Sequence, residues 1–336
     1  MKQNVLITGG TGFIGSHLAE FLCLRGDEVS CLIQKTSNLR WLTTLPLHFH
    51  FGEVTDKESL REAVRGKDII FHLASLTKAI HHEDYYRVNA GGTKNLLEIC
   101  VEENPGLKRF VLVSSQAAAG PSPFEIPIDE TCQPHPITDY GKSKLEAEKI
   151  ARSFMDKIPI TIVRPPAVYG PRDRDIYMQF KMINKGWDFQ IGKNDPLVSL
   201  VFAPDLSEAM ALLADNEKGK GETYFVSNPE PYRSSDLCCE IIKLMGKDRV
   251  HRFSVPKPLA GLVAWLSELQ ASFTKKPALL NRQKILELSQ PFWVCSAGKL
   301  KEHTGYSCPT PIEKGFAQTI EWYRQNHWLF CRSLSC

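Results

Sequence analysis

The feature that most constrains the fold is a glycine-rich turn near the start of the chain, within VLITGGTGFIGSHL at residues 5–18. The first residues of this stretch are apolar and partly β-branched, which indicates a buried strand. From Phe13 onward, apolar residues recur at helical spacing. The turn between the strand and the helix contains Gly9, Gly12 and Gly15.

Each glycine has its own role in such a turn. Gly9 can adopt a backbone conformation closed to other residues, Gly12 lets the main chain approach a ligand, and Gly15 lets the helix pack close to the strand. The free amides at the start of the helix favour an anion, and a dinucleotide pyrophosphate suits them. An ordinary glycine-rich turn would show the same spacing. The position of this turn, at the start of an alternating strand and helix pattern, favours dinucleotide binding.

Composition limits the classes of partner. The 336 residues suffice to bury a large core. A net charge of +3, from 41 basic and 38 acidic residues, is too small to favour nucleic acid or an anionic membrane as the main partner. The ten cysteines form no C-x-x-C pair and no zinc-like pattern, so we expect no metal site and a reducing, cytoplasmic compartment. We also expect no signal peptide.

Strand-like runs alternate with amphipathic helical stretches over the first half of the chain, which predicts a parallel sheet covered on both faces. We expect a dinucleotide-binding domain over 1–170 with crossovers from later segments, a mainly helical substrate lobe over 171–330, and a tail over 331–336. Further strands are predicted at Glu28–Ile33, Leu47–Phe51, Asp68–Leu73, Arg109–Ser114 and Ile158–Val163.

A tyrosine and a lysine four residues apart stand out in YGKSKLEAEKIA. Tyr140 and Lys144 share one face of a predicted helix, so an ammonium lies beside a phenol. A nearby cation lowers the pKa of a tyrosine toward neutrality, as a proton donor and acceptor for an alcohol and ketone pair requires. The same spacing also occurs on solvated helix faces. Ser114 and Ser115 end a predicted strand, where open α/β sheets bind ligands, although serines there can also simply start a loop.

Taken together, these motifs resemble the extended short-chain dehydrogenase/reductase superfamily, in its NAD-dependent epimerase/dehydratase family. The resemblance covers nearly the whole chain. It rests on TGGTGFIG (8–15), HLAS (72–75), VNAGGT (88–93), SSQAAAGP (114–121), YGKSK (140–144) and RPPAVYGPR (164–172).

This resemblance implies a Rossmann-type, doubly wound α/β fold with a smaller C-terminal lobe, and a homodimer. It also implies that Ser115 orients the substrate oxygen, that Tyr140 is the general acid and base, and that Lys144 holds the nicotinamide ribose and lowers the pKa of Tyr140. His72 is expected to be structural. The other residues expected to contact the cofactor are Gly9, Gly12, Phe13, Ile14, Gly15, Lys35, Ser37, Glu53, Val54, Leu73, Ala74, Ser75, Asn89, Pro166 and Val168.

The cofactor type depends on the end of the second strand. NAD enzymes of the family usually carry an acid there that binds the adenosine ribose, whereas this chain has Ile33. Lys35, nearby hydroxyls and Arg40 would suit a 2′-phosphate, so we predict NADP. NAD is the alternative if Lys35 and Arg40 are instead solvated loop charges. Glu53 replaces the aspartate that the family usually places near the adenine.

The substrate is predicted to be a secondary alcohol or ketone. Ala167 stands where nucleotide-sugar enzymes usually carry an asparagine. The AAAGP segment after the two serines makes that wall of the expected substrate site small and apolar. Both features favour dihydroflavonol-reductase-like and 3β-hydroxysteroid-dehydrogenase-like relatives. The alternatives are an NAD-dependent sugar epimerase or dehydratase, and a non-catalytic dinucleotide-binding sensor.

A second apolar stretch, at residues 255–273, has helical spacing but is too short and interrupted to span a bilayer. We expect a lobe helix that packs on the core or on a second copy, with an interfacial membrane helix as the alternative. No integral membrane span is predicted.

Overall fold

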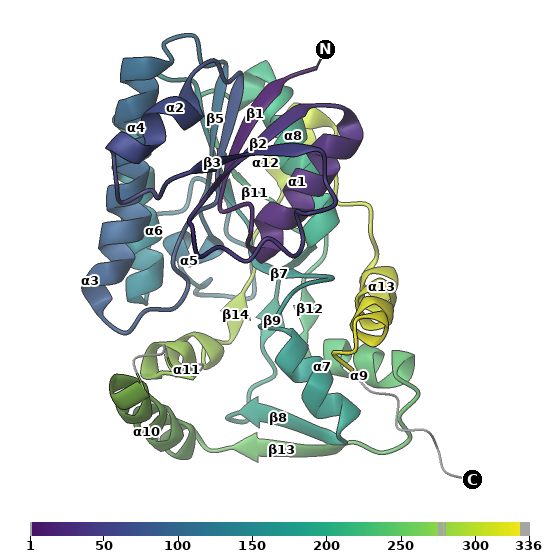
Figure 1. The fold of residues 1–336 in the computed structure, drawn as a ribbon. Helices are drawn as coiled ribbons and strands as arrows, with labels where there is room; N and C mark the ends of the chain where they lie inside the picture. The colour runs from purple at the N-terminus through teal and green to yellow at the C-terminus, as the bar shows by residue number, and fades with distance from the viewer. Residues whose placement is uncertain (1, 275–277, 279, 330–336) are drawn as a thin grey trace.

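The computed structural model describes residues 2–274, 278 and 280–329. Its centre is a seven-stranded, fully parallel sheet with the strand order β11-β6-β5-β4-β1-β2-β3 (Figure 1). The strands are β1 Asn4–Thr8, β2 Glu28–Ile33, β3 Leu47–Phe51, β4 Ile69–His72, β5 Arg109–Val113, β6 Ile160–Arg164 and β11 Thr223–Phe225.

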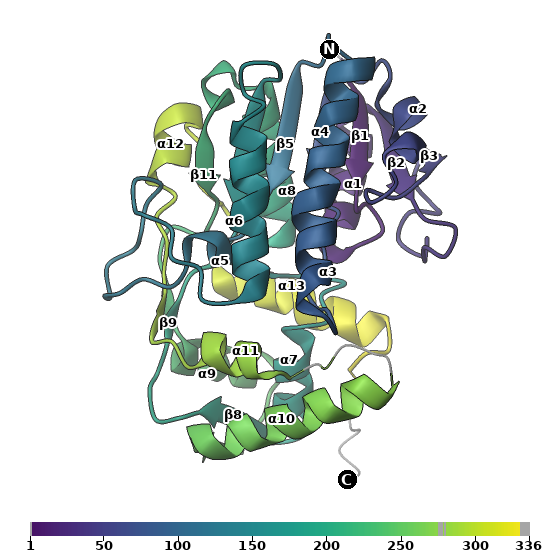
Figure 2. The ribbon, with the colours of Figure 1, turned by 90° about the vertical axis from the view of Figure 1, so that its left-hand side faces the viewer.

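Helices cover both faces of this sheet because its strands are apolar on both sides. Val5 and Ile7 of β1 pack into one core with α1, α8 and α12, while Leu6 packs into the other with α2, α4 and α6. The two helical layers are visible in Figure 2. Their bounds are α1 Phe13–Arg25, α8 Ala203–Asp215, α12 Gly298–Thr304, α2 Arg61–Val64, α4 Gly92–Glu103 and α6 Asp139–Arg152.

A smaller lobe lies below the carboxyl edge of the sheet (Figures 1 and 2). Its main core is aromatic and includes Tyr169, Phe180, Phe202, Phe316 and Tyr323. The helices are α7 Tyr177–Asn184, α9 Ser234–Leu244, α10 Lys257–Thr274, α11 Arg282–Leu288 and α13 Ile312–Gln325. Among the described residues, three small sheets accompany them, formed by β7 Ala167–Tyr169, β8 Trp187–Ile191, β9 Leu197–Val198, β10 Leu200–Phe202, β12 Tyr232–Arg233, β13 His251–Val255 and β14 Phe292–Trp293.

The α/β fold class predicted from the sequence is confirmed. Short connecting helices lie near the carboxyl edge, namely α3 His82–Tyr85, a π-helix at Tyr86–Gly91 and α5 Gln116–Ala119; two 3₁₀ turns occur at Glu58–Leu60 and Glu217–Gly219. Among the described residues, no helix combines the length and the hydropathy needed to cross a membrane.

Candidate active site

The glycine-rich turn has the close contacts that its sequence requires. Gly9 has a φ of +76°, and a Cβ there would lie 2.7 Å from the Ala74 amide nitrogen. A Cβ on Gly15 would lie 2.2 Å from the Gly9 carbonyl oxygen. Only glycine at position 15 therefore lets α1 pack this close to the turn. Gly12 precedes α1, and a Cβ added there would have only the Gly9 carbonyl oxygen within 4 Å, at 3.2 Å. The turn therefore leaves room beside Gly12, at the amides of Phe13 and Ile14, as a pyrophosphate site requires.

The end of β4 forms the adjacent wall. The Leu73 amide donates to the Thr8 carbonyl at 3.0 Å, and the Ala74 amide donates to Thr8 Oγ1 at 3.2 Å. His72 bonds through Nδ1 to Thr8 Oγ1 at 2.7 Å and through Nε2 to Thr93 Oγ1 at 3.0 Å. Burial lowers the pKa of His72 to about 3. His72 is thus a neutral link between β4, β1 and α4, and residues 73–75 remain partly exposed.

The loop after β2 brings Lys35 and Ser37 near the surface. Ile33 is buried, and Ser37 Oγ accepts a hydrogen bond from the Gln34 amide at 3.0 Å. The Gln34 side chain donates to Glu53 Oε2 at 3.0 Å. A carboxylate therefore lies beside this loop although none occurs at Ile33, a contact that the sequence analysis did not indicate.

Tyr140 lies in the first turn of α6, which Thr138 begins by accepting a hydrogen bond from the Gly141 amide at 3.2 Å. Ser115 precedes α5 at the end of β5, and its Oγ accepts from the Ala117 amide at 3.1 Å. The Ser115 side chain lies near enough to Tyr140 to act on the pKa of the phenol, because α5 packs against α6. The structure thus brings together the two hydroxyls that the sequence analysis assigned to the substrate oxygen.

Lys144 is held against the end of β5. Its Nζ donates to the Val113 carbonyl at 2.6 Å, and burial lowers the pKa of Lys144 to about 8, with Glu148 acting in the opposite direction. Burial raises the pKa of Tyr140 to about 12, although the Ser115 side chain lowers it. Desolvation of the phenolate thus outweighs the influence of Ser115, and the effect of Lys144 on the pKa of Tyr140 stays a prediction.

A buried polar network supports α6 from behind. Glu148 accepts hydrogen bonds from Ser114 Oγ at 2.5 Å and from Arg164 through both carboxylate oxygens, at 2.9 and 2.6 Å. All three residues are almost fully buried. The sequence analysis missed Glu148, although its position four residues after Lys144 on the same helix face was an available signal.

Asn89 supports the same helix from the π-helix. Its Nδ2 donates to Ser143 Oγ at 2.9 Å and to the Leu76 carbonyl at 3.0 Å, while its Oδ1 accepts from the Leu76 amide at 2.7 Å. Ser143 in turn donates to the Tyr140 carbonyl at 2.7 Å. Asn89 therefore positions the helix of Tyr140.

The other predicted cofactor residues lie on neighbouring elements. Val54 is buried after β3, and Pro166 is buried between β6 and β7. Val168 is half-buried in β7. Among the described residues, no group of three or more His, Cys, Asp or Glu side chains is arranged to hold a metal ion.

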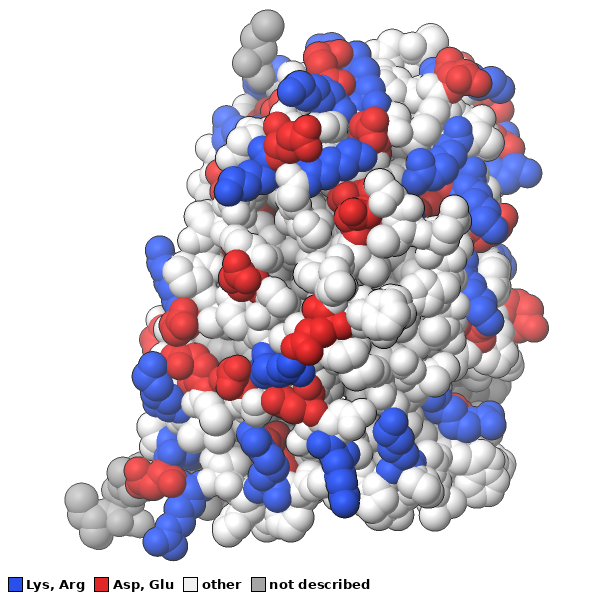
Figure 3. Space-filling model, turned by 180° about the vertical axis from the view of Figure 1, so that it is seen from behind, with Lys and Arg blue, Asp and Glu red and all other residues white. Residues whose placement is uncertain are grey.

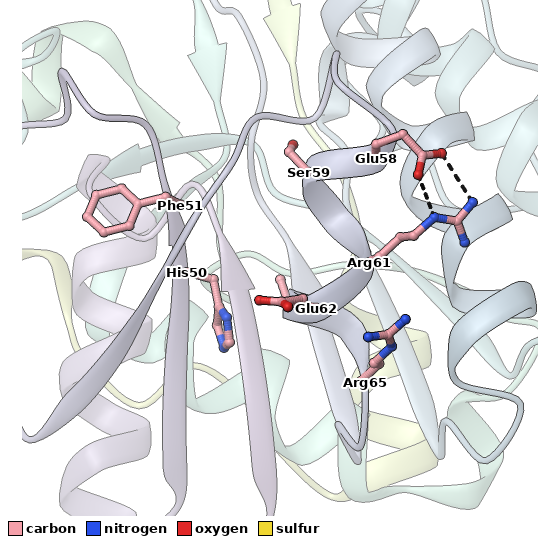
Figure 4. Close-up of a pocket in the computed structure, with 8 residues that line it drawn as sticks. His50, Phe51, Glu58, Ser59, Arg61, Glu62 and Arg65 are labelled. Atoms are coloured by element: carbon pink, nitrogen blue, oxygen red, sulfur yellow. Dashed lines mark hydrogen bonds and ion pairs between the residues drawn. The ribbon is translucent and has the colours of Figure 1, made fainter.

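Two surface cavities are lined by other residues. One of about 450 Å³ lies beside β3 and α2, where His50 and Glu62 point toward each other (Figure 4). Burial lowers the pKa of His50 more than the Glu62 charge raises it. The second, of about 640 Å³, is lined by Arg40, Arg174, Tyr177, Met178, Lys181, Asn184, Lys185, His327, Trp328 and Leu329.

The profile of the NAD dependent epimerase/dehydratase family matches residues 5–227, which include the glycine turn, Ser115, Tyr140 and Lys144. The chain belongs to this family. Like its relatives in the extended short-chain dehydrogenase/reductase superfamily, it is an NAD(P)-dependent oxidoreductase or epimerase.

Two curated proteins are similar to this chain over almost their full length. The N-acetyl-alpha-D-glucosaminyl-diphospho-ditrans,octacis-undecaprenol 4-epimerase of Escherichia coli O157:H7 is 26% identical, over 96% of this chain and 96% of the epimerase. The decarboxylating sterol-4-alpha-carboxylate 3-dehydrogenase of Candida albicans is 26% identical, over 96% and 98%. The fold also matches the UDP-glucose 4-epimerase of Thermotoga maritima with UDP-glucose, with a TM-score of 0.79 at 22% identity, covering 96% of this chain and 99% of that chain.

Proposed function

We propose that this chain is an NADP(H)-dependent oxidoreductase that interconverts a secondary alcohol and its ketone. The nicotinamide, when bound, supplies or accepts the hydride. In the reducing direction Ser115 donates a hydrogen bond to the carbonyl oxygen, and the Tyr140 hydroxyl gives that oxygen its proton. Lys144 would bind the nicotinamide ribose, and the amides after Gly12 would bind the pyrophosphate.

The proximity of the Tyr140 and Ser115 hydroxyls carries this proposal. It places one hydroxyl that can hold an oxygen beside another that can give it a proton, at the carboxyl edge of the sheet. Open parallel sheets bind their ligands at that edge. A protein that only binds the dinucleotide has no use for this pair of hydroxyls.

NADP(H) is proposed over NAD(H) because Lys35 is exposed after a β2 that ends in buried Ile33. An exposed ammonium there is available for a charge-assisted bond to a 2′-phosphate. Glu53, the nearby carboxylate, already accepts hydrogen bonds from Gln34 and Thr55 at 3.0 and 2.7 Å. These bonds reduce its availability to a ribose.

A second candidate is a sugar epimerase or dehydratase that oxidises its substrate transiently and keeps its cofactor bound. The similarity to the undecaprenol-linked 4-epimerase of Escherichia coli favours it. Ala167 favours the first candidate, because it is exposed and offers no polar group for a nucleotide. We further propose a homodimer through α4 and α6, which lie side by side on the outer face (Figure 2).

Native mass spectrometry and absorbance of the purified protein test the two candidates. We expect a protein that exchanges NADPH freely and oxidises it when ketones are supplied. NAD retained through purification would favour the epimerase or dehydratase instead. Failure to bind either dinucleotide would contradict both.

A further inference from the structure

Helix α10 packs through its small residues and exposes its large ones. Ala260, Ala264 and Ala271 are buried, the first two in a small cluster with Ile285 of α11. In a helix of 3.6 residues per turn, the large apolar residues fall mainly on the opposite face. Each of the following is at least 47% exposed: Leu259, Leu262, Val263, Trp265, Leu266 and Phe273. A helix that only packed on its own lobe would bury this face.

The two-stranded sheet beside α10 is aromatic on its outer side. Trp187, Phe189 and Phe253 are between 41% and 52% exposed, and the rings of Phe189 and Phe253 stack at 5.8 Å. Asp188 and Arg252, on the inner side, form a 2.7 Å ion pair. Figures 1 and 2 show α10, β8 and β13 together at the end of the lobe farthest from the large sheet. We call these exposed side chains of α10, β8 and β13 the lobe-end surface.

Basic residues flank both ends of the two-stranded sheet. Lys185 and Arg249 lie at one end, where the His251 amide donates to the Gly186 carbonyl at 2.9 Å. Lys193 and Lys257 lie at the other, where the Gly192 amide donates to the Val255 carbonyl at 2.9 Å. All four are exposed.

Few acidic residues oppose these basic ones. Asp188 is paired with Arg252, and Glu268 of α10 is paired with Arg282 at 2.8 Å. Asp195, two residues after Lys193, accepts from the Ser235 amide at 2.9 Å, and exposed Asp248 follows beside Arg249 in the chain. Figure 3 shows Lys and Arg spaced along this lower edge beside uncharged surface. The net charge of the chain is small, so the positive character that matters here is local.

We propose that the lobe-end surface docks on the surface of a bilayer that contains anionic phospholipid. Its apolar side chains enter the boundary between headgroups and acyl chains, and the flanking basic residues contact lipid phosphates. A second copy of this chain is a poorer occupant, because a two-fold interface would bring the same basic residues of both copies together.

The lobe-end surface is connected to Tyr140 through α11. Besides packing on α10, α11 contacts the start of α6: Thr138 Oγ1 donates to Glu287 Oε1 at 3.1 Å, and the Asp139 amide donates to Gln283 Oε1 at 2.7 Å. Docking would therefore hold the site close to the lipid. Resting on the proposed function, the substrate class that fits is an alcohol or ketone borne by a lipid.

Flotation with vesicles tests the docking. Full-length protein is mixed with vesicles of phosphatidylglycerol and phosphatidylcholine, or of phosphatidylcholine alone. We expect flotation with the anionic vesicles, and a loss of roughly tenfold to a hundredfold in partitioning for Leu262→Ser/Leu266→Ser, because both side chains lose apolar burial in the lipid. The matched control is Leu24→Ser, which changes an exposed leucine at the end of α1 and should float like the wild type.

Two further measurements separate docking from catalysis and from self-association. NADPH binding, and turnover of a ketone that dissolves in water, should be unchanged in Leu262→Ser/Leu266→Ser. A loss of that turnover in Tyr140→Phe alone would therefore report on the proposed function. No flotation of the wild type, or equal flotation of wild type and double variant, overturns the docking. A change of sedimentation mass in the double variant, without flotation of the wild type, would assign the surface to a second copy.

Discussion

The proposed chemistry depends on one group, the Tyr140 hydroxyl. Tyr140→Phe keeps the ring and its edge contact with the Tyr85 ring, 6.3 Å away between centroids, but removes the proton that the substrate oxygen needs. We expect turnover to fall by roughly a hundredfold or more, while dinucleotide affinity stays within a few-fold. Steady-state kinetics and a direct NADPH titration measure the two effects. Near-normal turnover would remove Tyr140 from the mechanism.

Lys35 is the residue that would distinguish NADP(H) from NAD(H). A charge-assisted contact with a 2′-phosphate contributes on the order of 1.5 to 3 kcal/mol, so Lys35→Ala should weaken NADP(H) binding by roughly tenfold to a hundredfold. NAD(H) binding should hardly change. Calorimetric titration of both cofactors checks this. Equal weakening of the two, or tighter binding of NAD(H) by the wild type, would make Lys35 a solvated loop residue.

The elements of the large sheet were predictable because each has a local signal. The predicted bounds of β2 and β3 agree with the structure, and those of β4, β5 and β6 agree within two residues. These strands are apolar runs that end in turn residues, and in the helices between them apolar residues recur at helical spacing. Tyr140, Ser115 and Lys144 were predicted as site residues for a related reason, since each stands at a fixed place in a short motif.

The contacts missed from the sequence join segments that are distant in the chain. β8 pairs with β13 across more than sixty residues, and neither run carries a sign of its partner. Gln283 and Glu287 contact the start of α6, yet in the sequence they are ordinary polar residues of a short helix. Lys144 was correctly placed on a face of α6, but its bond to Val113 depends on how closely α6 packs on β5.

In the glycine turn, we expect a substitution at one position to affect dinucleotide binding and a substitution at another to affect stability. At Gly12 a side chain would meet only one backbone atom, so Gly12→Val should abolish dinucleotide binding with little loss of stability. At Gly15 the new Cβ would overlap the Gly9 carbonyl, so Gly15→Val should lower the free energy of unfolding by several kcal/mol. Urea denaturation and NADPH titration of both variants test this. Unchanged affinity in Gly12→Val would mean that the turn holds another ligand.

At the scale of the whole molecule, the large sheet and the lobe are joined by single polar contacts between distant segments. His17 of α1 bonds through Nε2 to the Pro171 carbonyl at 2.7 Å, across 154 residues. Arg172 binds Glu20 of the same helix at 2.6 Å. Together with the contacts of α11 on α6, these bonds tie the lobe to both helical layers. The stability of the molecule should therefore depend on the protonation state of these groups.

Two buried histidines make this dependence testable. Burial lowers the pKa of His17 to about 4 and that of His72 to about 3, from 6.5 in the unfolded chain. Below pH 6.5 the unfolded state binds protons that the folded state does not, so the free energy of unfolding should fall as the pH falls. Each histidine contributes a slope of about 1.4 kcal/mol per pH unit until its folded pKa is reached.

Urea denaturation between pH 7.5 and 5 measures this slope. His17→Gln keeps an amide that can donate to Pro171 but cannot titrate, so it should reduce the slope by about 1.4 kcal/mol per pH unit below pH 6. His81→Gln, at an exposed histidine, is the matched control and should leave the slope unchanged. If His17→Gln and the wild type lose stability in parallel, His17 is not held neutral at the junction, and the fall in stability at low pH belongs to other groups.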